Sequence, residues 1–218
     1  RDCFFTGVQE GMVGAERIIK MLNVVDDELV VEEKGIYSIE NFINARRIMY
    51  WQVYLHKISI CSEKMLIELI KRVNICWNKN NSISATPALS LFIGNNFSAR
   101  DLNKNPKLLQ AFMELDDNDI WGSIKYWLDH EDPVINILSH ALKNRKLFKI
   151  EILKKPLKPL QLTAIKKKVA KKLKLSLEMT ESLITQGCLT NAACTVKNQS
   201  ISILRKNGKV EEITTAVD

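Results

Sequence analysis

Histidine is scarce in this chain, and its scarcity argues against a common class of metal centre. The 218 residues contain three histidines, His56, His130 and His140. A metal site built from His and Asp needs two or more histidines with carboxylates nearby. Asp129 precedes His130, and no second histidine follows at helical spacing. We therefore expect this chain to bind no metal ion with its own residues.

The sequence also lacks a disulfide framework, a membrane span and the common catalytic motifs. Its five cysteines are widely spaced and form no CxxC pair, which favours buried thiols in a reducing, cytoplasmic setting. No apolar run approaches the roughly 20 residues of a membrane helix, so we expect no membrane partner. No glycine-rich phosphate loop and no Ser/His/Asp grouping stands out. We assign no catalytic residue in this chain.

Basic charge is present, but it is concentrated toward the C-terminus. The chain carries a net charge of +7, divided into −4 over residues 1–140 and +11 over residues 141–218. Six of the lysines lie between positions 166 and 174. Such a patch attracts nucleic acid or polyphosphate, whereas the alternative is a lysine-rich helix face that is simply solvated. Because no aromatic residues interleave with these lysines to stack bases, nucleic acid is a possible partner but not the favoured one.

Hydrophobic periodicity predicts a mainly helical chain with a small C-terminal α+β lobe. Residues 39–76 contain no Gly or Pro and repeat apolar residues every three or four positions. This pattern predicts one very long helix that begins after an N-cap at Ser38, or two helices with a bend near 59–62. We expect long helices to form a bundle. Further helices are predicted at 9–22, 107–114, 133–146 and 160–173.

Strand patterns are short and lie mostly in the last third of the chain. We predict strands at 29–33, 148–153, 193–196 and 201–204. Asn207-Gly208 predicts a hairpin with a type I′ turn. The change in character near residue 147 predicts two domains, a helical body at 1–146 and a basic α+β lobe at 147–218.

One stripe on the long predicted helix could bind a phosphorylated ligand. Arg46, Tyr50 and Tyr54 are spaced at i, i+4 and i+8, so they share a helix face. Arginine offers a planar fork of donors to phosphate, and tyrosine offers a flat face with a hydroxyl. The alternative is a helix that packs its aromatic rings into the core while the arginine reaches solvent. Spacing alone favours the alternative.

Several short segments resemble one enzyme family in their order along the chain. They are Arg1-Asp2-Cys3, Gly7-Val8-Gln9, Arg17 with Ile18-Ile19-Lys20, Asp27-Glu28-Leu29, Ala45-Arg46 and Tyr54-Leu55-His56-Lys57. Together they resemble the deoxynucleotide triphosphohydrolase (dGTPase-like) branch of the HD-domain phosphohydrolases. The segment ISILRKNGKVEEI at 201–213 is similar to the C-terminal lobe of bacterial members. The fold implied is the distal part of an HD-domain fold.

The resemblance implies roles for the stripe. Members hydrolyse a dNTP to a deoxynucleoside and triphosphate, using a divalent metal held by His and Asp residues, and they work as oligomers. Asp2 matches an aspartate that binds the sugar 3′-hydroxyl, Arg46 an arginine that grips the phosphates, and Tyr54 a tyrosine beside the sugar and base. Tyr50 stands where some members have histidine. The resemblance therefore makes substrate binding the favoured interpretation of Asp2, Arg46, Tyr50 and Tyr54.

Some members also bind activating nucleotides where their subunits meet. By resemblance, Arg17, Lys34 and Lys57 are candidate allosteric nucleotide-binding residues. We accordingly expect nucleoside triphosphates as ligands and a homo-oligomer as the assembly.

The family's metal-binding segment has no counterpart in this sequence. The HxxxH…HD pattern is missing, so the chain is interpreted as the C-terminal portion of an HD-type hydrolase, with the divalent metal held elsewhere in the parent enzyme. We expect the isolated chain to be inactive. The alternatives are a non-catalytic module that binds nucleotides or nucleic acid, and an oligomerisation lobe with no ligand.

Overall fold

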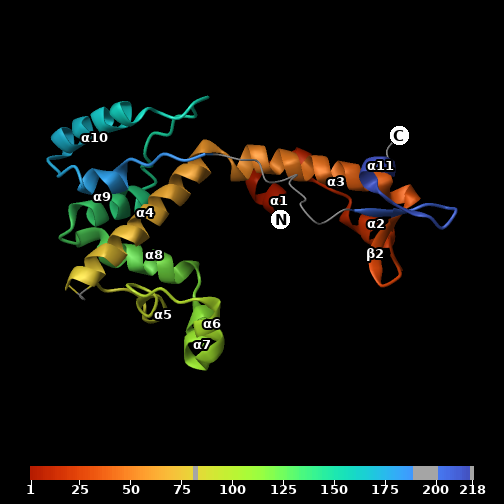
Figure 1. The fold of residues 1–218 in the computed structure, drawn as a ribbon, viewed down its shortest axis with the longest axis horizontal. Helices are drawn as coiled ribbons and strands as arrows, with labels where there is room; N and C mark the ends of the chain where they lie inside the picture. The colour runs from red at the N-terminus through yellow and green to blue at the C-terminus, as the bar shows by residue number, and fades with distance from the viewer. Residues whose placement is uncertain (81–82, 189–200, 217–218) are drawn as a thin grey trace. The chain divides into compact units, whose positions relative to one another are not determined.

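The computed structural model describes residues 1–80, 83–188 and 201–216, which fold as two compact units (Figure 1). The first unit contains residues 1–59 and the chain from residue 188 onward, and the second contains residues 60–187. Helix α4 (Lys57–Asn80) begins in the first unit and continues into the second. Each unit is described below by itself.

The first unit combines short helices with a small sheet. The longest helix that lies wholly within it, α3 (Ile36–Met49), continues directly into a π-helical turn, η3 (Tyr50–Tyr54). The other helical segments of this unit are α1 (Asp2–Thr6), η1 (Gln9–Gly11), α2 (Ala15–Lys20), η2 (Glu33–Gly35) and α11 (Ile213–Ala216).

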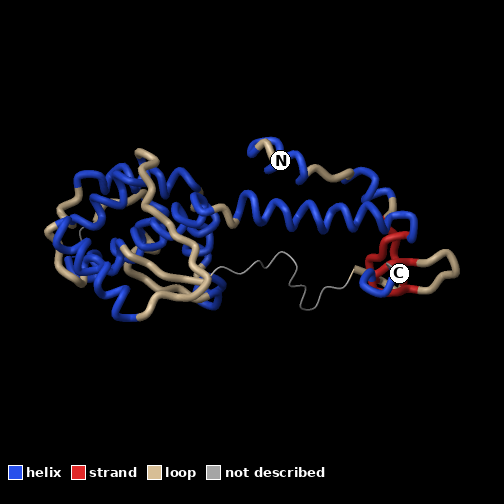
Figure 2. Tube along the Cα trace, turned by 90° about the horizontal axis from the view of Figure 1, so that it is seen from above, coloured by secondary structure: helices blue, strands red, loops and turns tan. Residues whose placement is uncertain are grey.

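Four strands form one sheet in the order β1-β2-β3-β4 (Figure 2). Strand β1 (Leu22–Val25) pairs antiparallel with β2 (Glu28–Glu32), and β3 (Ser202–Leu204) pairs antiparallel with β4 (Val210–Glu212). The two hairpins join through a parallel pairing of β2 with β3. The sheet therefore draws on both ends of the chain, and the predicted mainly helical fold with a small α+β part is confirmed.

The two hairpins use different turns. The type I′ turn lies at Asp26-Asp27, where both residues have positive φ, 50° and 62°, as that turn requires. The hairpin predicted at Asn207-Gly208 is present, but the prediction of a type I′ turn is wrong. Only Gly208 there has positive φ, 83°, and its N–H donates to the Arg205 carbonyl at 2.9 Å. This is a three-residue loop that ends in a glycine bulge.

A small apolar core holds the sheet against α3. Its fully buried centre is Ile203 of β3, and Val31 of β2 and Ile39 of α3 lie beside it at 4% and 5% exposure. One backbone approach is tight, because a Cβ on Gly35 would lie 2.6 Å from the Val31 side chain.

The second unit is a bundle of helices. Pro stands at the first turn of several of them, where its missing N–H costs nothing. After α4, these helices are α5 (Pro87–Ser90), α6 (Ala99–Lys104), α7 (Pro106–Glu114), α8 (Asp117–Tyr126), η4 (Trp127–Asp129), α9 (Pro133–Lys143), α10 (Pro159–Leu173) and η5 (Met179–Leu183).

The core of this bundle is large and closely packed. Leu69 of α4, Ile135 and Leu138 of α9 are completely buried, and Trp127 is 1% exposed. The indole N–H of Trp127 donates to the Ser84 carbonyl at 2.7 Å, so its polar atom is satisfied inside the core.

A buried ion pair ties α4 to α9. Arg72 is 6% exposed, and its Nε and Nη2 donate to Asp132 Oδ2 at 3.0 and 2.6 Å. The other carboxylate oxygen accepts the N–H groups of Val134 and Ile135, each at 3.0 Å, and so caps α9. Burial acts to raise the pKa of Asp132, but the hydrogen bonds from Arg72 and Ile135 outweigh it and hold that pKa below its ordinary value.

Some predicted elements differ from those observed. Residues 9–22 are not one helix but η1, α2 and the start of β1. Helix α3 begins after Gly35 rather than Ser38, without a side-chain cap. The long helix is divided by the π turn and by Leu55 and His56, just before the predicted bend.

The strand predicted at 148–153 is wrong, because that segment has no strand structure. Its apolar residues Phe148 and Ile150 instead pack on the core of the second unit. The strand predicted at 193–196 lies outside the described residues. The domain boundary predicted at 147 stays a prediction, although the two compact units divide the chain at other positions. Within the described residues, no helix has the length and apolarity that a membrane crossing requires.

Candidate nucleotide-binding site

Three of the predicted binding residues lie close together where α3 passes into η3. The Cζ of Arg46 lies 5.2 Å from the centre of the Tyr50 ring, and its Nη2 donates to the Tyr50 hydroxyl at 3.4 Å. The rings of Tyr50 and Tyr54 meet edge to face with centres 5.1 Å apart. Arg46 and Tyr54 are exposed and Tyr50 is half-buried. The stripe is therefore available to a ligand rather than packed into the core.

The fourth predicted residue, Asp2, joins this group from the start of the chain. The Tyr54 hydroxyl donates a hydrogen bond to Oδ2 of Asp2, across 52 positions of sequence. This bond raises the pKa of Tyr54 above its ordinary value, because it favours the protonated phenol, and burial and the Asp2 charge act in the same direction. Tyr54 therefore stays a hydrogen-bond donor at neutral pH.

A hollow of about 270 Å³ opens between these side chains. Figure 1 shows α1, which carries Asp2, close to the C-terminal part of α3. All four predicted substrate-binding residues line the hollow. Its lining consists of Arg1, Asp2, Cys3, Gly11, Val13, Phe42, Ala45, Arg46, Met49, Tyr50 and Tyr54.

Sequence reasoning missed the residues that form the floor of the hollow. Cys3 Sγ lies 3.7 Å from Met49 Sδ, which brings α1 onto α3. A Cβ on Gly11 would lie 2.5 Å from Cys3 Sγ and 2.6 Å from Met49 Cγ, so η1 approaches this contact as closely as a glycine allows. The position of Phe42 in the apolar repeat predicted that it lies on the apolar face of a helix. The sequence did not show which segments that face contacts.

The electrostatics of the hollow suit an anion with a hydroxyl group. Arg1 and Arg46 contribute two guanidinium groups to its lining, and Asp2 contributes a carboxylate. Guanidinium groups bind phosphate oxygens, and a carboxylate accepts hydrogen bonds from hydroxyls. The tyrosine rings add flat surfaces on which a sugar or base can pack. The arrangement can therefore bind a phosphorylated sugar or nucleoside.

The predicted allosteric residues lie elsewhere. Arg17 is on α2, Lys34 is on η2 and Lys57 is the first residue of α4, and all three are exposed. Lys34 pairs with Glu32 at 2.9 Å. None of the three lines the hollow. Their nucleotide-binding role stays a prediction.

No group of side chains suited to a divalent metal ion comes together in the described parts of the chain. There, no three His, Cys, Asp or Glu side chains are grouped so that they could hold an ion. Of the histidines, His56 and His140 are exposed, and His130 Nδ1 accepts the Asp132 N–H at 2.9 Å. The described residues thus do not fit a divalent metal, and we derive no step through one.

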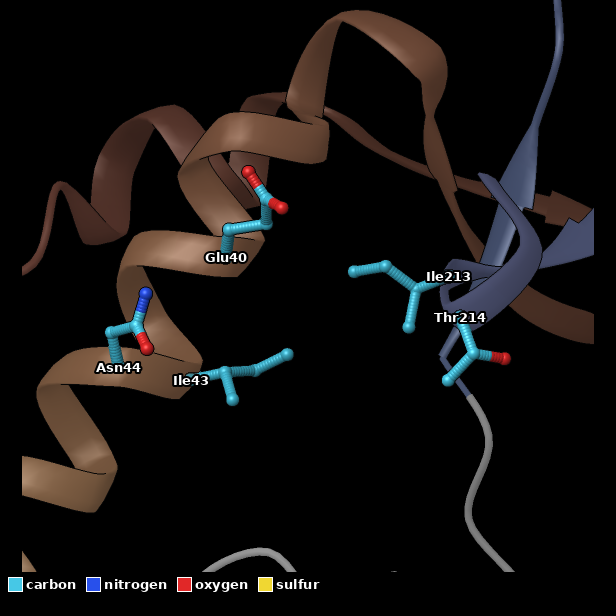
Figure 3. A pocket seen from close by; sticks show the side chains of 5 residues that line it. All are labelled: Glu40, Ile43, Asn44, Ile213 and Thr214. Carbon is cyan, nitrogen blue, oxygen red and sulfur yellow. The ribbon is translucent and has the colours of Figure 1, made fainter. Parts of the chain in front are cut away.

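A second hollow of about 260 Å³ lies between α3 and α11 (Figure 3). Ile43 and Ile213 face the space from its two sides, with Glu40, Asn44 and Thr214 around them. Its lining contains no basic side chain, whereas the hollow at Arg46 is lined by two arginines.

Comparison with known proteins finds similarity to an HD associated region and to a solved phosphohydrolase. Residues 13–83 match the profile of the HD associated region. A phosphohydrolase from Bacteroides thetaiotaomicron with a known crystal structure has 41% sequence identity to this chain. The two structures match with a TM-score of 0.88, and the match covers all of this chain and 54% of that one. A hypothetical protein from Aquifex aeolicus, 18% identical with a TM-score of 0.50, shares the fold.

Two curated relatives are described as uncharacterized proteins. YwfO of Bacillus subtilis is 30% identical over 151 residues, which are 68% of this chain and 32% of YwfO. MG461 of Mycoplasma genitalium is 33% identical over 85 residues, which are 37% of this chain and 20% of MG461. The chain therefore spans about a third or less of these relatives and about half of the solved phosphohydrolase.

Proposed function

We propose that the hollow at Arg46 binds a nucleoside triphosphate, as the substrate-side half of a metal-dependent HD-type dNTP triphosphohydrolase. The observation that carries the proposal is the meeting of Asp2, Arg46, Tyr50 and Tyr54 in one hollow. Similarity to a solved phosphohydrolase supports the reaction class. The dNTP substrate is inferred from the resemblance of the sequence segments.

In this proposal each side chain has one task. The guanidinium of Arg46 neutralises phosphate charge while the Tyr50 ring beneath it limits its orientations. Asp2 accepts a hydrogen bond from the sugar 3′-hydroxyl. Tyr54 forms the wall beside the sugar. The isolated chain binds the nucleotide but does not hydrolyse it, because the described residues provide no metal site.

Calorimetric titration of the 218-residue chain with dGTP tests the binding. We expect Arg46→Ala to weaken binding at least tenfold, since hydrogen bonds to charged groups are worth about 1.5–3 kcal/mol. Arg47→Ala is the matched control, because Arg47 is an equally exposed arginine of the same helix turn that does not line the hollow. Equal losses in both variants would show only a general effect of charge and would contradict the site.

Measuring the release of triphosphate from dGTP in the presence of Mg²⁺ or Mn²⁺ tests whether the isolated chain hydrolyses the nucleotide. We expect no release of triphosphate by the isolated chain. Robust turnover by these residues alone would overturn that part of the proposal.

A second candidate function rests on helix α10. This helix has no buried residue, and Lys167, Lys168, Lys171 and Lys172 are all exposed. A lysine surface of this kind could bind the phosphate backbone of nucleic acid. Binding to a DNA duplex that weakens steeply with salt would support this function, because phosphate contacts release counterions.

A further inference from the structure

The hydrogen bond from Tyr54 to Asp2 indicates a role for Tyr54 in addition to its proposed packing beside the sugar. We propose that the Tyr54 hydroxyl is a positioning group that orients the Asp2 carboxylate, and that it thereby sets selectivity for ligands with a 3′-hydroxyl. The inference rests on the proposed nucleotide binding and deepens it.

The contact that orients the Asp2 carboxylate comes from a distant part of the chain. Asp2 lies on α1, which has no buried residue. The Cys3–Met49 contact holds the helix to α3. The carboxylate of Asp2 itself accepts the Tyr54 hydroxyl. The bond to Tyr54 therefore fixes where the carboxylate points.

The π turn explains why Tyr54 reaches Asp2. In a continuous α-helix, positions i and i+8 differ by about 80° around the axis, which would turn Tyr54 away from Arg46. A π turn closes through an i to i+5 bond and so winds less per residue. Here the Leu55 N–H donates to the Tyr50 carbonyl at 2.7 Å. The turn thus brings Tyr54 back toward the face that carries Arg46.

The end of the π turn is itself held in place. The Val53 carbonyl accepts the Ser59 hydroxyl at 3.0 Å and the His56 N–H at 3.3 Å. Carbonyls at a helix end otherwise lack partners. Tyr54 is therefore presented to the Asp2 carboxylate from a backbone that these hydrogen bonds hold, and so we infer that Tyr54 positions Asp2.

The Asp2 carboxylate can accept further hydrogen bonds while it is bonded to Tyr54. Tyr54 occupies Oδ2, and an ionised carboxylate has about four acceptor positions over its two oxygens. The remaining positions can accept a sugar hydroxyl, and holding the group in place beforehand reduces the entropy lost on binding. A ligand without that hydroxyl gains nothing from this arrangement.

The test compares dGTP with 2′,3′-dideoxy-GTP, which differ only in the 3′-hydroxyl. We expect the wild-type chain to bind dGTP roughly tenfold more tightly, the value of one charge-assisted hydrogen bond. Tyr54→Phe removes one oxygen atom and should bring the ratio of the two dissociation constants close to one. Its affinity for inorganic triphosphate, which has no sugar, should stay unchanged.

Tyr50→Phe is the matched control, because it removes the other tyrosine hydroxyl of the same turn. That hydroxyl accepts a hydrogen bond from Arg46 Nη2 at 3.4 Å rather than donating one to Asp2. We expect Tyr50→Phe to change both dissociation constants by the same factor, so that their ratio stays at the wild-type value.

The outcomes separate the inference from the proposed function. If the wild type prefers dGTP and Tyr54→Phe keeps that preference, the inference is wrong while nucleotide binding stands. A larger preference in Tyr54→Phe would show that Tyr54 competes with the ligand, which also overturns the inference. If the wild type binds neither nucleotide, both proposals are overturned.

A measurement without ligand tests the anchoring directly. Backbone amides of residues 3–7 should exchange with deuterium several-fold faster in Tyr54→Phe than in Tyr50→Phe. Equal exchange in the two variants would show that the Tyr54 hydroxyl does not hold α1, and it would overturn the inference whatever the ligand.

Discussion

The two compact units differ in how much of their apolar surface they bury. The second unit encloses Leu69, Trp127 and Leu138 almost completely. In the first unit, Phe4, Phe5 and Tyr37 are 85%, 75% and 83% exposed around a small core. The candidate site lies in the thinly packed first unit. The larger apolar core and the proposed site therefore lie in separate units, and the predictions below test whether stability and ligand binding separate in the same way.

The largest expected effect is on the second unit. Arg72→Met removes one partner of the buried pair and leaves the Asp132 charge without compensation. We expect a loss of about 3–5 kcal/mol in the free energy of unfolding, measured by urea denaturation. Lys71→Ala, which removes the partner of a surface pair with Glu68, should cost less than about 1 kcal/mol. Similar costs would mean that the pair is not buried in solution.

The same pair predicts how the second unit responds to acid. Because the folded pKa of Asp132 lies below its ordinary value of 3.8, its contribution is fully present above that value. The contribution is lost as the pH falls through the folded pKa. The difference in urea midpoint between wild type and Asp132→Asn should be constant from pH 7 to 5 and shrink below about pH 4. A difference that grows at low pH would contradict the assignment.

A moderate effect is expected on the first unit and on its site together. Gly11→Ala places a methyl group against Cys3 and Met49, and we expect it to cost about 1–3 kcal/mol and to weaken dGTP binding. Gly14→Ala is the control, since its nearest neighbour there is 3.9 Å away. Circular dichroism melting and calorimetry measure the two effects. Loss of binding in Gly14→Ala as well would point to general unfolding.

The smallest effect is expected at a half-buried ionic cluster beside the sheet. Glu33 accepts the Lys206 N–H at 3.1 Å and pairs with Arg205 at 3.2 Å, and these contacts lower its pKa. Glu33→Gln should lower the melting temperature by less than Gly11→Ala does. The difference from wild type should be constant above the ordinary pKa of 4.5 and shrink as the pH falls through the lower folded pKa, because wild-type Glu33 is then neutralised as well. A difference that persists there would assign the effect to something other than charge.

The sequence was informative where local chemistry decides the structure. Helices α7, α9 and α10 begin at prolines and carry apolar faces, and their predicted starts are within a residue or so of those observed. The parallel pairing of β2 with β3 joins residues some 170 positions apart and left no local signal. Alternation at 148–153 looked like a strand, yet no strand among the described residues pairs with this segment, and Phe148 packs on helices instead.

The candidate site was predictable in part for the same reason. The spacing of Arg46, Tyr50 and Tyr54 predicted a shared helix face, but Tyr54 reaches that face only because of the π turn, which left no signal in the sequence. The contact between Tyr54 and Asp2 joins distant segments, so only a family resemblance could suggest that they act together. The close approach of Gly11 to Cys3 and Met49 depends on how three segments pack, and nothing in the local sequence specifies it.

Hydrogen exchange with and without dGTP tests the central claim most directly, because it locates the ligand on the chain. The account predicts that dGTP slows exchange in residues 1–13 and 42–55, which surround the hollow, and leaves α10 unchanged. Protection confined to residues 159–173 would instead assign phosphate binding to the lysine-rich helix and would contradict the proposed site.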